Sequence, residues 1–226
     1  MTLILIIAAY FLGSIPFSYL IARRCGIDIR QVGTRSASPG NVWRCVGHIA
    51  GALSLAAEVA KGAAPMLVAR ALTGDDLVVL LVGLAAMAGH NWPLFLGLNG
   101  GRGASLGLIT ILLVSTQWLG LALVPLAIVY FAMRDSAPAI LVSFLLAPAL
   151  AAIVGFNQME IAAACGIPAI TPLRRVTAPG ESNNHGNRRQ VFLNRLIFDR
   201  CERRRRESPP RLHRNPDAAG GQSGIL

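Results

Sequence analysis

A glycine-rich segment at residues 89–103 holds the side chains best suited to chemistry in this chain. It reads GHNWPLFLGLNGGRG and contains His90, Gly100, Gly101 and Arg102. Closely spaced glycines let backbone N–H groups crowd around an oxyanion, and an arginine adds a planar, permanently charged fork for phosphate oxygens. We therefore expect a phosphate site where the chain leaves an apolar segment. The alternative is an interfacial hinge with one snorkelling arginine.

Two ionisable residues, Glu58 and Lys61, stand inside an otherwise apolar stretch. Residues three apart on a helix share a face and can pair. Because a charge inside a membrane span is costly, such a residue usually faces a polar cavity and serves a function. Lys61 is the only lysine in the chain, which makes it a candidate phosphate ligand. A structural ion pair near the start of a helix is the alternative.

Two polar segments nearer the N-terminus offer further phosphate ligands. The loop at residues 33–44 reads GTRSASPGNVWR, and its small hydroxyl side chains, Asn41 and Arg44 suit phosphate oxygens. The interruption GSIP at residues 13–16 places Ser14 and backbone carbonyls at membrane depth, where irregular backbone must line protein or a cavity. The alternatives are a solvated loop and an ordinary proline kink.

Two polar residues in the second half of the chain complete the set. Ser136 follows Arg134 at the start of an apolar block, where the N–H groups of a helix N-terminus favour an anion. His185 lies in the polar segment after the last apolar block, from which it could fold back over a site. A helix cap and a tail residue are the respective alternatives.

The composition indicates that a bilayer is the solvent of this protein. Hydrophobic residues make up 54% of the 226 residues and charged residues 14%, whereas soluble domains carry about 25% charged residues. The net charge is +10, and twelve of the 21 basic residues follow Leu173. In a membrane protein, cytoplasmic arginines and anionic headgroups explain this excess better than nucleic acid does. The four cysteines lack metal-ligand or disulfide spacing, so we expect neither a metal site nor a disulfide framework.

Long apolar blocks predict an all-α, polytopic membrane protein with about seven transmembrane helices. A helix of about 20 residues crosses a hydrocarbon core of about 30 Å. The predicted spans are residues 2–22, 48–72, 77–98, 104–115, 119–133, 137–155 and 160–173. Residues 1–200 form the predicted membrane domain. Residues 201–226, rich in Arg, Pro, Ser and Gly, form a predicted basic and disordered cytoplasmic tail.

The distribution of arginines predicts how these spans are oriented. With the N-terminus outside, the loops after the first, third, fifth and seventh spans face the cytoplasm. Those loops carry most of the arginines, in agreement with the positive-inside rule, and Arg70 is the exposed exception. The candidate phosphate ligands in these loops then share one membrane face. The sequence therefore predicts a single composite site on the cytoplasmic side.

Four ordered segments carry a family resemblance. Residues 9–22 read AYFLGSIPFSYLIA and lead into a first loop at residues 26–47. The segment EVAKG at residues 58–62 resembles a D-x-x-K-G element, and residues 89–103 are similar to G-H-x-x-P-x-F-L-x-F-K-G-G-K-G. In this order and spacing the chain resembles the bacterial acyl-phosphate-dependent glycerol-3-phosphate acyltransferases. The resemblance implies a seven-helix enzyme of phospholipid synthesis in the bacterial inner membrane, with its active site facing the cytoplasm.

The resemblance implies transfer of an acyl group from acyl phosphate to glycerol 3-phosphate, which gives lysophosphatidic acid and phosphate. It implies no metal, no cofactor and no acyl-enzyme, and its partners are the two substrates and membrane lipids, without nucleic acid. The implied catalytic residues are Ser14, Lys61, His90 and Arg102. The implied phosphate-binding residues are Asn41, Arg44, Gly100, Gly101, Ser136 and His185.

The chain departs from the family patterns at several positions. The loop pattern G-S-G-N-x-G-A-T-N is here residues 33–41, GTRSASPGN, so Arg35 and Ser36 replace an inner Gly and an Asn. Asn99 and Arg102 stand where the family pattern has lysines. These departures leave open a catalytically impaired relative that binds lipid or a partner protein. A transporter for an anionic metabolite is a weaker alternative, since the unequal spans show no inverted repeat.

Overall fold

The computed structural model describes residues 1–155, 158–177 and 196–197, and it contains no strand in these ranges. The predicted all-α class is confirmed. In chain order the elements are α1 Thr2–Ser14, α2 Phe17–Arg24, α3 Pro39–Cys45, α4 His48–Thr73, α5 Asp76–Asn91, the 3₁₀ helix η1 Leu94–Leu96, α6 Ala104–Val114, α7 Thr116–Met133, α8 Ser136–Val154 and α9 Gln158–Thr177. The predicted tail at residues 201–226 lies outside the described residues.

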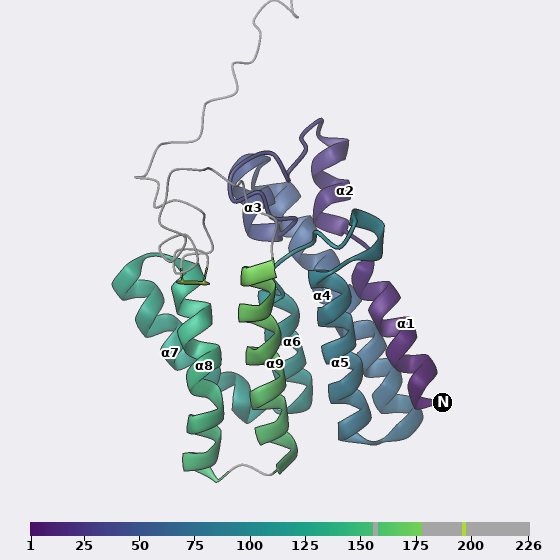
Figure 1. The fold of residues 1–226 in the computed structure, drawn as a ribbon, viewed down its shortest axis with the longest axis vertical. Coiled ribbons are helices and arrows are strands. Elements are labelled where there is room, and N and C mark those ends of the chain that lie inside the picture. Colours follow the sequence, from purple (N-terminus) through teal and green to yellow (C-terminus); the bar gives the residue numbers. More distant parts are fainter. Residues whose placement is uncertain (156–157, 178–195, 198–226) are drawn as a thin grey trace, which may run out of the picture.

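The long helices form one bundle with its short helices gathered at one end. Helices α1, α4 and α5 pack together in one half, α7 and α8 pack in the other, and α6 and α9 lie between them (Figure 1). Helices α2 and α3 lie beyond the ends of the long helices (Figure 1). We call this the polar end, formed by α2, α3 and the loops at residues 25–38, 92–103 and 134–135.

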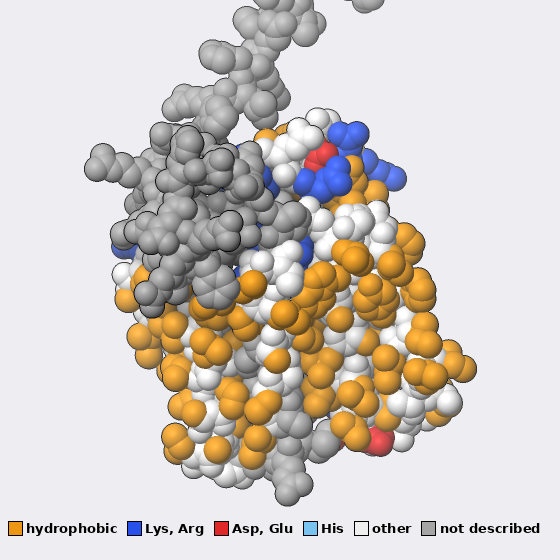
Figure 2. Space-filling model, in the orientation of Figure 1, with side chains coloured by type: hydrophobic (Ala, Val, Ile, Leu, Met, Phe, Trp, Pro, Cys, Tyr) orange, Lys and Arg blue, Asp and Glu red, His pale blue; other side chains and the backbone are white. Residues whose placement is uncertain are grey.

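The surface of the bundle fits a bilayer. Figure 2 shows hydrophobic side chains over the helical body and Lys and Arg side chains near α2 and α3. Ile4, Phe131 and Ile153 are more than 70% exposed, which is costly in water and ordinary against lipid tails.

Four segments of the described chain are long and apolar enough to cross a membrane: Thr2–Arg24, His48–Thr73, Asp76–Leu96 and Ser136–Val154. Two shorter apolar helices are Ala104–Val114 and Ala122–Met133. A helix therefore occupies each of the seven predicted positions, and α9 fills the last. The count of seven spans and the outside N-terminus stay predictions.

Helices α1 and α5 approach so closely that only glycine fits at two of their contacts. A Cβ atom at Gly13 would lie 2.1 Å from Ala86 O, and one at Gly89 would lie 2.1 Å from Tyr10 O. Small residues let helix backbones pack closely in membranes, where no hydrophobic force draws helices together. This contact fixes the end of α5, and with it the start of the glycine-rich loop.

The first predicted span is broken into α1 and α2 at residues 15–16. Proline has no N–H to continue the helix, so carbonyl groups at the break need other donors. Lys61 Nζ donates to Gly13 O at 2.9 Å and to Ile15 O at 2.8 Å. The break thus exposes carbonyls at membrane depth, as its sequence indicated, and a buried lysine from α4 satisfies them.

Candidate active site

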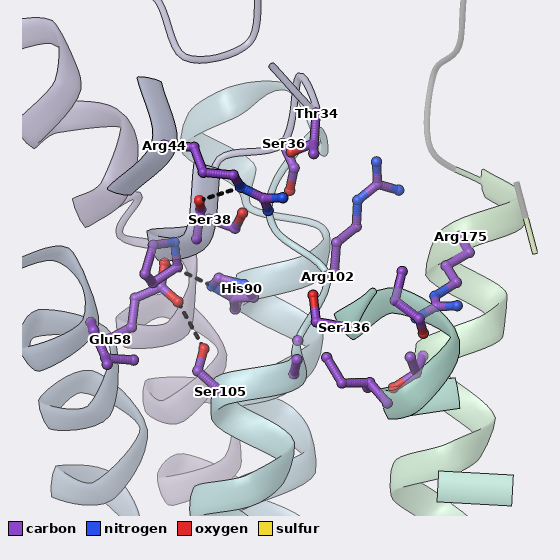
Figure 3. Close-up of a pocket in the computed structure, with 18 of the residues that line it drawn as sticks. Thr34, Ser36, Ser38, Arg44, Glu58, His90, Arg102, Ser105, Ser136 and Arg175 are labelled. Carbon is purple, nitrogen blue, oxygen red and sulfur yellow. Dashed lines mark hydrogen bonds and ion pairs between the residues drawn. The ribbon is translucent and has the colours of Figure 1, made fainter. Parts of the chain in front are cut away.

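A pocket of about 240 Å³ opens among the elements at the polar end. Arg44 from α3, Arg102 from the loop before α6 and Arg175 from α9 all line it. Figure 3 shows Arg102 between the other two arginines in this view. Three segments distant in the sequence therefore bring permanent positive charge to one cavity, as a phosphate site requires.

Hydroxyl groups line the same pocket. They come from loop 33–38, α6, α8 and α9, and belong to Thr34, Ser36, Ser38, Ser105, Ser136 and Thr171. Ser36 is 2% exposed, and its Oγ has no hydrogen-bond partner among the described residues. A buried hydroxyl left in this state is available to a ligand oxygen. Leu55 and Ile140 add apolar surface to the lining.

The buried side of the pocket is formed by Glu58 and His90. Ser18 Oγ donates to Glu58 Oε1 at 2.6 Å, and Ser105 Oγ donates to Glu58 Oε2 at 3.0 Å. His90 Nδ1 lies 3.8 Å from Glu58 Oε1, as Figure 3 shows. The carboxylate therefore joins α2, α4, α5 and α6 at one point below the arginines.

The glycine-rich loop folds back on the end of α5. Gly101 N donates to His90 O at 3.1 Å, and Gly100 N donates to Asn91 O at 3.3 Å. Both N–H groups are therefore bound within the fold, and the expectation that they donate to phosphate stays a prediction. Their lack of a side chain serves packing: a Cβ at Gly101 would lie 1.9 Å from His90 Nε2.

Asn41 organises the first loop and does not line the pocket. It is fully buried, and its Nδ2 lies 3.1 Å from the carbonyl oxygens of Ile29, Val32 and Ser36. Its Oδ1 accepts from Thr34 N at 2.9 Å. Its amide is thus bound to the loop that presents Thr34 and Ser36 to the cavity, and its assignment to phosphate binding stays a prediction.

Arg35 keeps a backbone conformation that suits the glycine of the family pattern. Its φ angle is +55°, in the left-handed region, which costs a side-chain-bearing residue about 1–2 kcal/mol. A turn that glycine adopts without steric cost is therefore formed here with an arginine.

A salt bridge outside the apolar helices holds the start of the first loop. Arg30 Nη2 lies 2.8 Å from Asp28 Oδ2, and the Arg30 guanidinium stacks 4.5 Å from the centre of the Tyr19 ring. Hydrogen bonding from Arg30 lowers the pKa of Asp28 from 3.8 to about 2. The contact of Arg30 with Tyr19 therefore holds the loop to α2.

Lys61 and Ser14 lie behind the pocket and not in its lining. Lys61 is bound to the carbonyls at the α1–α2 break, and Ser14 Oγ donates to Tyr10 O at 2.8 Å. Glu58 accepts from two serines, so the two charges on α4 serve different neighbours. The described contacts of Lys61 and Ser14 are thus with helix carbonyls outside the pocket lining, and their catalytic assignments stay predictions.

The predicted residues that do meet in the pocket are His90, Arg44, Arg102 and Ser136. His185 lies outside the described residues.

The sequence model of the glycerol-3-phosphate acyltransferase family matches residues 3–176, a range that includes every residue lining the pocket. This chain belongs to that family. The resemblance drawn from the motifs is thereby confirmed.

Individual acyltransferases of this family align with different shares of the chain. The glycerol-3-phosphate acyltransferase of Desulforamulus reducens is 43% identical over 122 residues, which are 54% of this chain and 61% of the relative. Glycerol-3-phosphate acyltransferase 5 of Dehalococcoides mccartyi is 32% identical over 211 residues, 90% of each chain. The chain spans 51–61% of the length of the first curated relatives that it matches.

Two solved acyltransferase structures share the fold. PlsY, an integral membrane glycerol 3-phosphate acyltransferase, superposes in its glycerol 3-phosphate form with a TM-score of 0.70 and 30% identity, over 77% of this chain and 88% of that chain. Its lysophosphatidic acid form gives a TM-score of 0.68 and 29% identity, over 77% and 87%. This likeness confirms an integral membrane fold for the chain.

Two arginines at the end of α9, Arg174 and Arg175, were missed by the sequence analysis of this family member. Arg175 lines the pocket and donates to Ala137 O at 2.6 Å and to Leu196 O at 2.7 Å. Arg174 is 1% exposed and contacts the glycine-rich loop. The available signal was a pair of arginines directly after the last apolar block, but they fall in no motif.

Proposed function

We propose that this membrane protein transfers an acyl group from acyl phosphate to a hydroxyl of glycerol 3-phosphate. The observation that carries the proposal is the convergence of Arg44, Arg102 and Arg175 on one hydroxyl-lined pocket. A pocket with this charge suits two phosphate groups held close together. Its family membership, and relatives crystallised with glycerol 3-phosphate and lysophosphatidic acid, support the same substrate and product.

The proposed reaction forms one carbon–oxygen bond and breaks another. The glycerol 3-phosphate hydroxyl oxygen bonds to the acyl carbon, and the bond from that carbon to the phosphate oxygen breaks. Phosphate leaves with the electron pair, and the hydroxyl proton ends on inorganic phosphate. Because acyl phosphate is already activated, orienting two anions and neutralising the leaving phosphate supply much of the catalysis. The reaction needs no metal, cofactor or acyl-enzyme.

The positions of the pocket residues suggest which of them bind phosphate, which orient the reacting hydroxyl and which contact the acyl group. The three arginines bind the phosphate groups, and Ser136 and the hydroxyls of loop 33–38 complete the oxygen contacts. Glu58 and His90 lie on the buried side, where the reacting hydroxyl must lie if both phosphates face the arginines. Leu55 and Ile140 supply apolar surface beside the acyl carbon.

We further propose that the pocket faces the cytoplasm of a bacterial inner membrane. Arginines gather at the polar end, and Asp75 and Asp76 lie at the opposite end, in the α4–α5 turn. The positive-inside rule then places the polar end in the cytoplasm and the N-terminus outside. Both phosphorylated substrates are charged and can reach the pocket from that side.

The test supplies purified protein with radiolabelled glycerol 3-phosphate and palmitoyl phosphate, with palmitoyl-CoA as the control donor. We expect labelled lysophosphatidic acid from palmitoyl phosphate alone. Arg102→Ala should lower turnover about 100-fold because it removes a positive charge from the leaving phosphate. Arg70→Ala is the matched control, since Arg70 pairs with Asp76 at the opposite end of the bundle.

Each contrary outcome has a separate meaning. Equal turnover by the Arg102 and Arg70 variants would show that the pocket is not the site. Binding of glycerol 3-phosphate without any product, by the wild-type protein, would favour the impaired relative suggested by the changed first-loop motif.

A further inference from the structure

Arg174 binds the glycine-rich loop from below while the end of α5 binds it from the other side. Arg174 Nε donates to Gly101 O at 3.1 Å. Its Nη2 donates to Asn99 Oδ1 at 3.0 Å and to Gly100 O at 3.2 Å. Three consecutive loop residues are thus held by one fully buried side chain from the last turn of α9.

The N–H groups of the same residues face the other way. Gly100 N and Gly101 N donate to Asn91 O and His90 O at the end of α5. The peptide groups of the loop are therefore fixed on both sides, between α5 and α9. Arg102 is the next residue along the chain, and its side chain lines the pocket.

The arrangement uses the fork of a guanidinium. The three acceptors bind two different nitrogens of Arg174, Nε and Nη2. A lysine has a single nitrogen on a flexible stem and cannot reproduce this fork. Removing Arg174 leaves three acceptors of a buried loop without their donor, which favours rearrangement of the loop.

The amide oxygen of Asn99 is a suitable acceptor for the Arg174 guanidinium. The family pattern has a lysine at this position, and a cation there would face the buried Arg174 guanidinium. An amide oxygen gives Arg174 an acceptor instead. The exchange at position 99 and the arginine on α9 therefore form one complementary pair.

We infer that Arg174 is the positioning residue of the site: it fixes residues 99–101 so that Arg102 enters the pocket, and it ties α9 to phosphate binding. Arg175, its neighbour on α9, lines the same pocket. The position of α9 thus determines where two of the three pocket arginines lie: Arg175 directly, and Arg102 through the loop that Arg174 holds. The effect on catalysis rests on the proposed function, whereas the effect on the loop does not.

Limited proteolysis tests the loop independently of activity. Arg102 is the only basic residue between Arg70 and Arg134, so trypsin cleavage there creates a unique new N-terminus at Gly103. In detergent, Arg174→Gln should be cleaved after Arg102 at least about tenfold faster than wild type, since both contacts of α9 with the loop backbone are lost. Arg70→Gln should leave this cleavage unchanged. Wild-type cleavage kinetics in Arg174→Gln would overturn the inference.

Asn99→Ala and Asn99→Lys provide a second route if Arg174→Gln fails to fold. Asn99→Ala removes one of three contacts and should raise cleavage after Arg102 by a smaller factor than Asn99→Lys, which also sets a cation against Arg174. Cleavage after the lysine introduced at position 99 is counted separately, because it gives an N-terminus at Gly100 and not at Gly103. Identical, wild-type cleavage of both variants would contradict the proposed pairing.

A double-mutant cycle tests the link to catalysis. If Arg174 acts through Arg102, Arg174→Gln lowers kcat/KM and Arg174→Lys does not restore it. The double variant with Arg102→Gln and Arg174→Gln should then have the same kcat/KM as Arg102→Gln alone. Additive losses would overturn the link, because they describe a general loss of structure. If wild-type protein shows no turnover, the proposed function fails, and the proteolysis still decides the role of Arg174 in the loop.

Discussion

At the scale of single residues, the pocket combines three arginines with one deeply buried carboxyl group. Glu58 is 1% exposed, and its two carboxyl oxygens lie among the hydroxyls of Ser18 and Ser105. A buried carboxylate is costly unless its oxygens accept hydrogen bonds. Both oxygens do so here, and His90 lies beside one of them. The polar contacts that hold Glu58 therefore also align four helices below the arginines.

Glu58→Gln tests this role without changing the size of the side chain. An amide has one acceptor oxygen, so either Ser18 or Ser105 loses its acceptor and faces an N–H₂ group instead. We expect a loss of about 1–3 kcal/mol in the free energy of unfolding and a fall in turnover. Thermal unfolding in detergent and the acyl transfer assay measure the two effects. A variant matching wild type in both would show that Glu58 only fills space.

Asp28 makes the stability of the first loop depend on pH. Its pKa is about 2 in the folded protein, against a usual value of 3.8, because Arg30 donates to it. A lowered pKa stabilises the fold above pH of about 4, and this contribution is lost as the pH falls toward 2. After allowance for solvent screening of Arg30 it amounts to about 1 kcal/mol.

Asp28→Asn should therefore lower the Tm at neutral pH by a few degrees, and the difference from wild type should shrink between about pH 4 and pH 2. Thermal unfolding over this pH range measures it. A Tm difference that persists unchanged to pH 2 would show that the ionised Asp28–Arg30 contact is not its source.

At the scale of elements, glycines decide how α1 meets α5. The backbones touch at Gly13 and Gly89, and a side chain at either position would overlap a carbonyl group. Since His90 and the glycine-rich loop follow directly after Gly89, this helix contact sets the position of the buried side of the pocket.

Gly89→Ala should destabilise the protein by about 3 kcal/mol or more, since its Cβ would lie 2.1 Å from Tyr10 O. Gly120→Ala is the matched control. A Cβ at Gly120 in α7 meets nothing within 4 Å, so it should be neutral or stabilise by up to about 1 kcal/mol through helix propensity. Thermal unfolding of both variants checks this prediction, and equal Tm values would disprove the close contact.

At the scale of the whole molecule, charge is divided between the two ends of an apolar bundle. Arginines from α2, α3, α9 and their loops lie at the polar end, and the acidic α4–α5 turn lies at the other. This division places the pocket, the cations and the end of α9 on one side of the membrane. It also makes the predicted orientation measurable.

Thiol labelling with an impermeant maleimide tests that orientation. Cys25 is exposed at the end of α2, and Asp75 is exposed in the α4–α5 turn. With Cys25 as the sole cysteine, we expect labelling in inside-out vesicles alone. With Asp75→Cys in a cysteine-free background, we expect labelling of intact spheroplasts. The reverse pattern would place the pocket outside the cytoplasm.

The sequence by itself determined the class of protein, its helices and its family. Long apolar blocks indicate burial in a bilayer, and ordered motifs indicate common descent. Both can be recognised without knowledge of the folded structure. It also found four residues that meet in the pocket, namely Arg44, His90, Arg102 and Ser136. These lie at helix ends and in loops, where residue type and membrane side are enough to suggest a polar site.

Only the tertiary structure decided which polar groups line the pocket and which contact other parts of the fold. Lys61 and Asn41 have the chemistry of phosphate ligands, yet a helix break and a loop backbone occupy them. Arg174 and Arg175 have no motif, yet α9 brings them to the glycine-rich loop and the pocket. The physical reason is that a buried donor or acceptor must be satisfied by whatever the fold places beside it. Those neighbours come from sequence-distant helices, so their identity follows from packing and not from spacing along the chain.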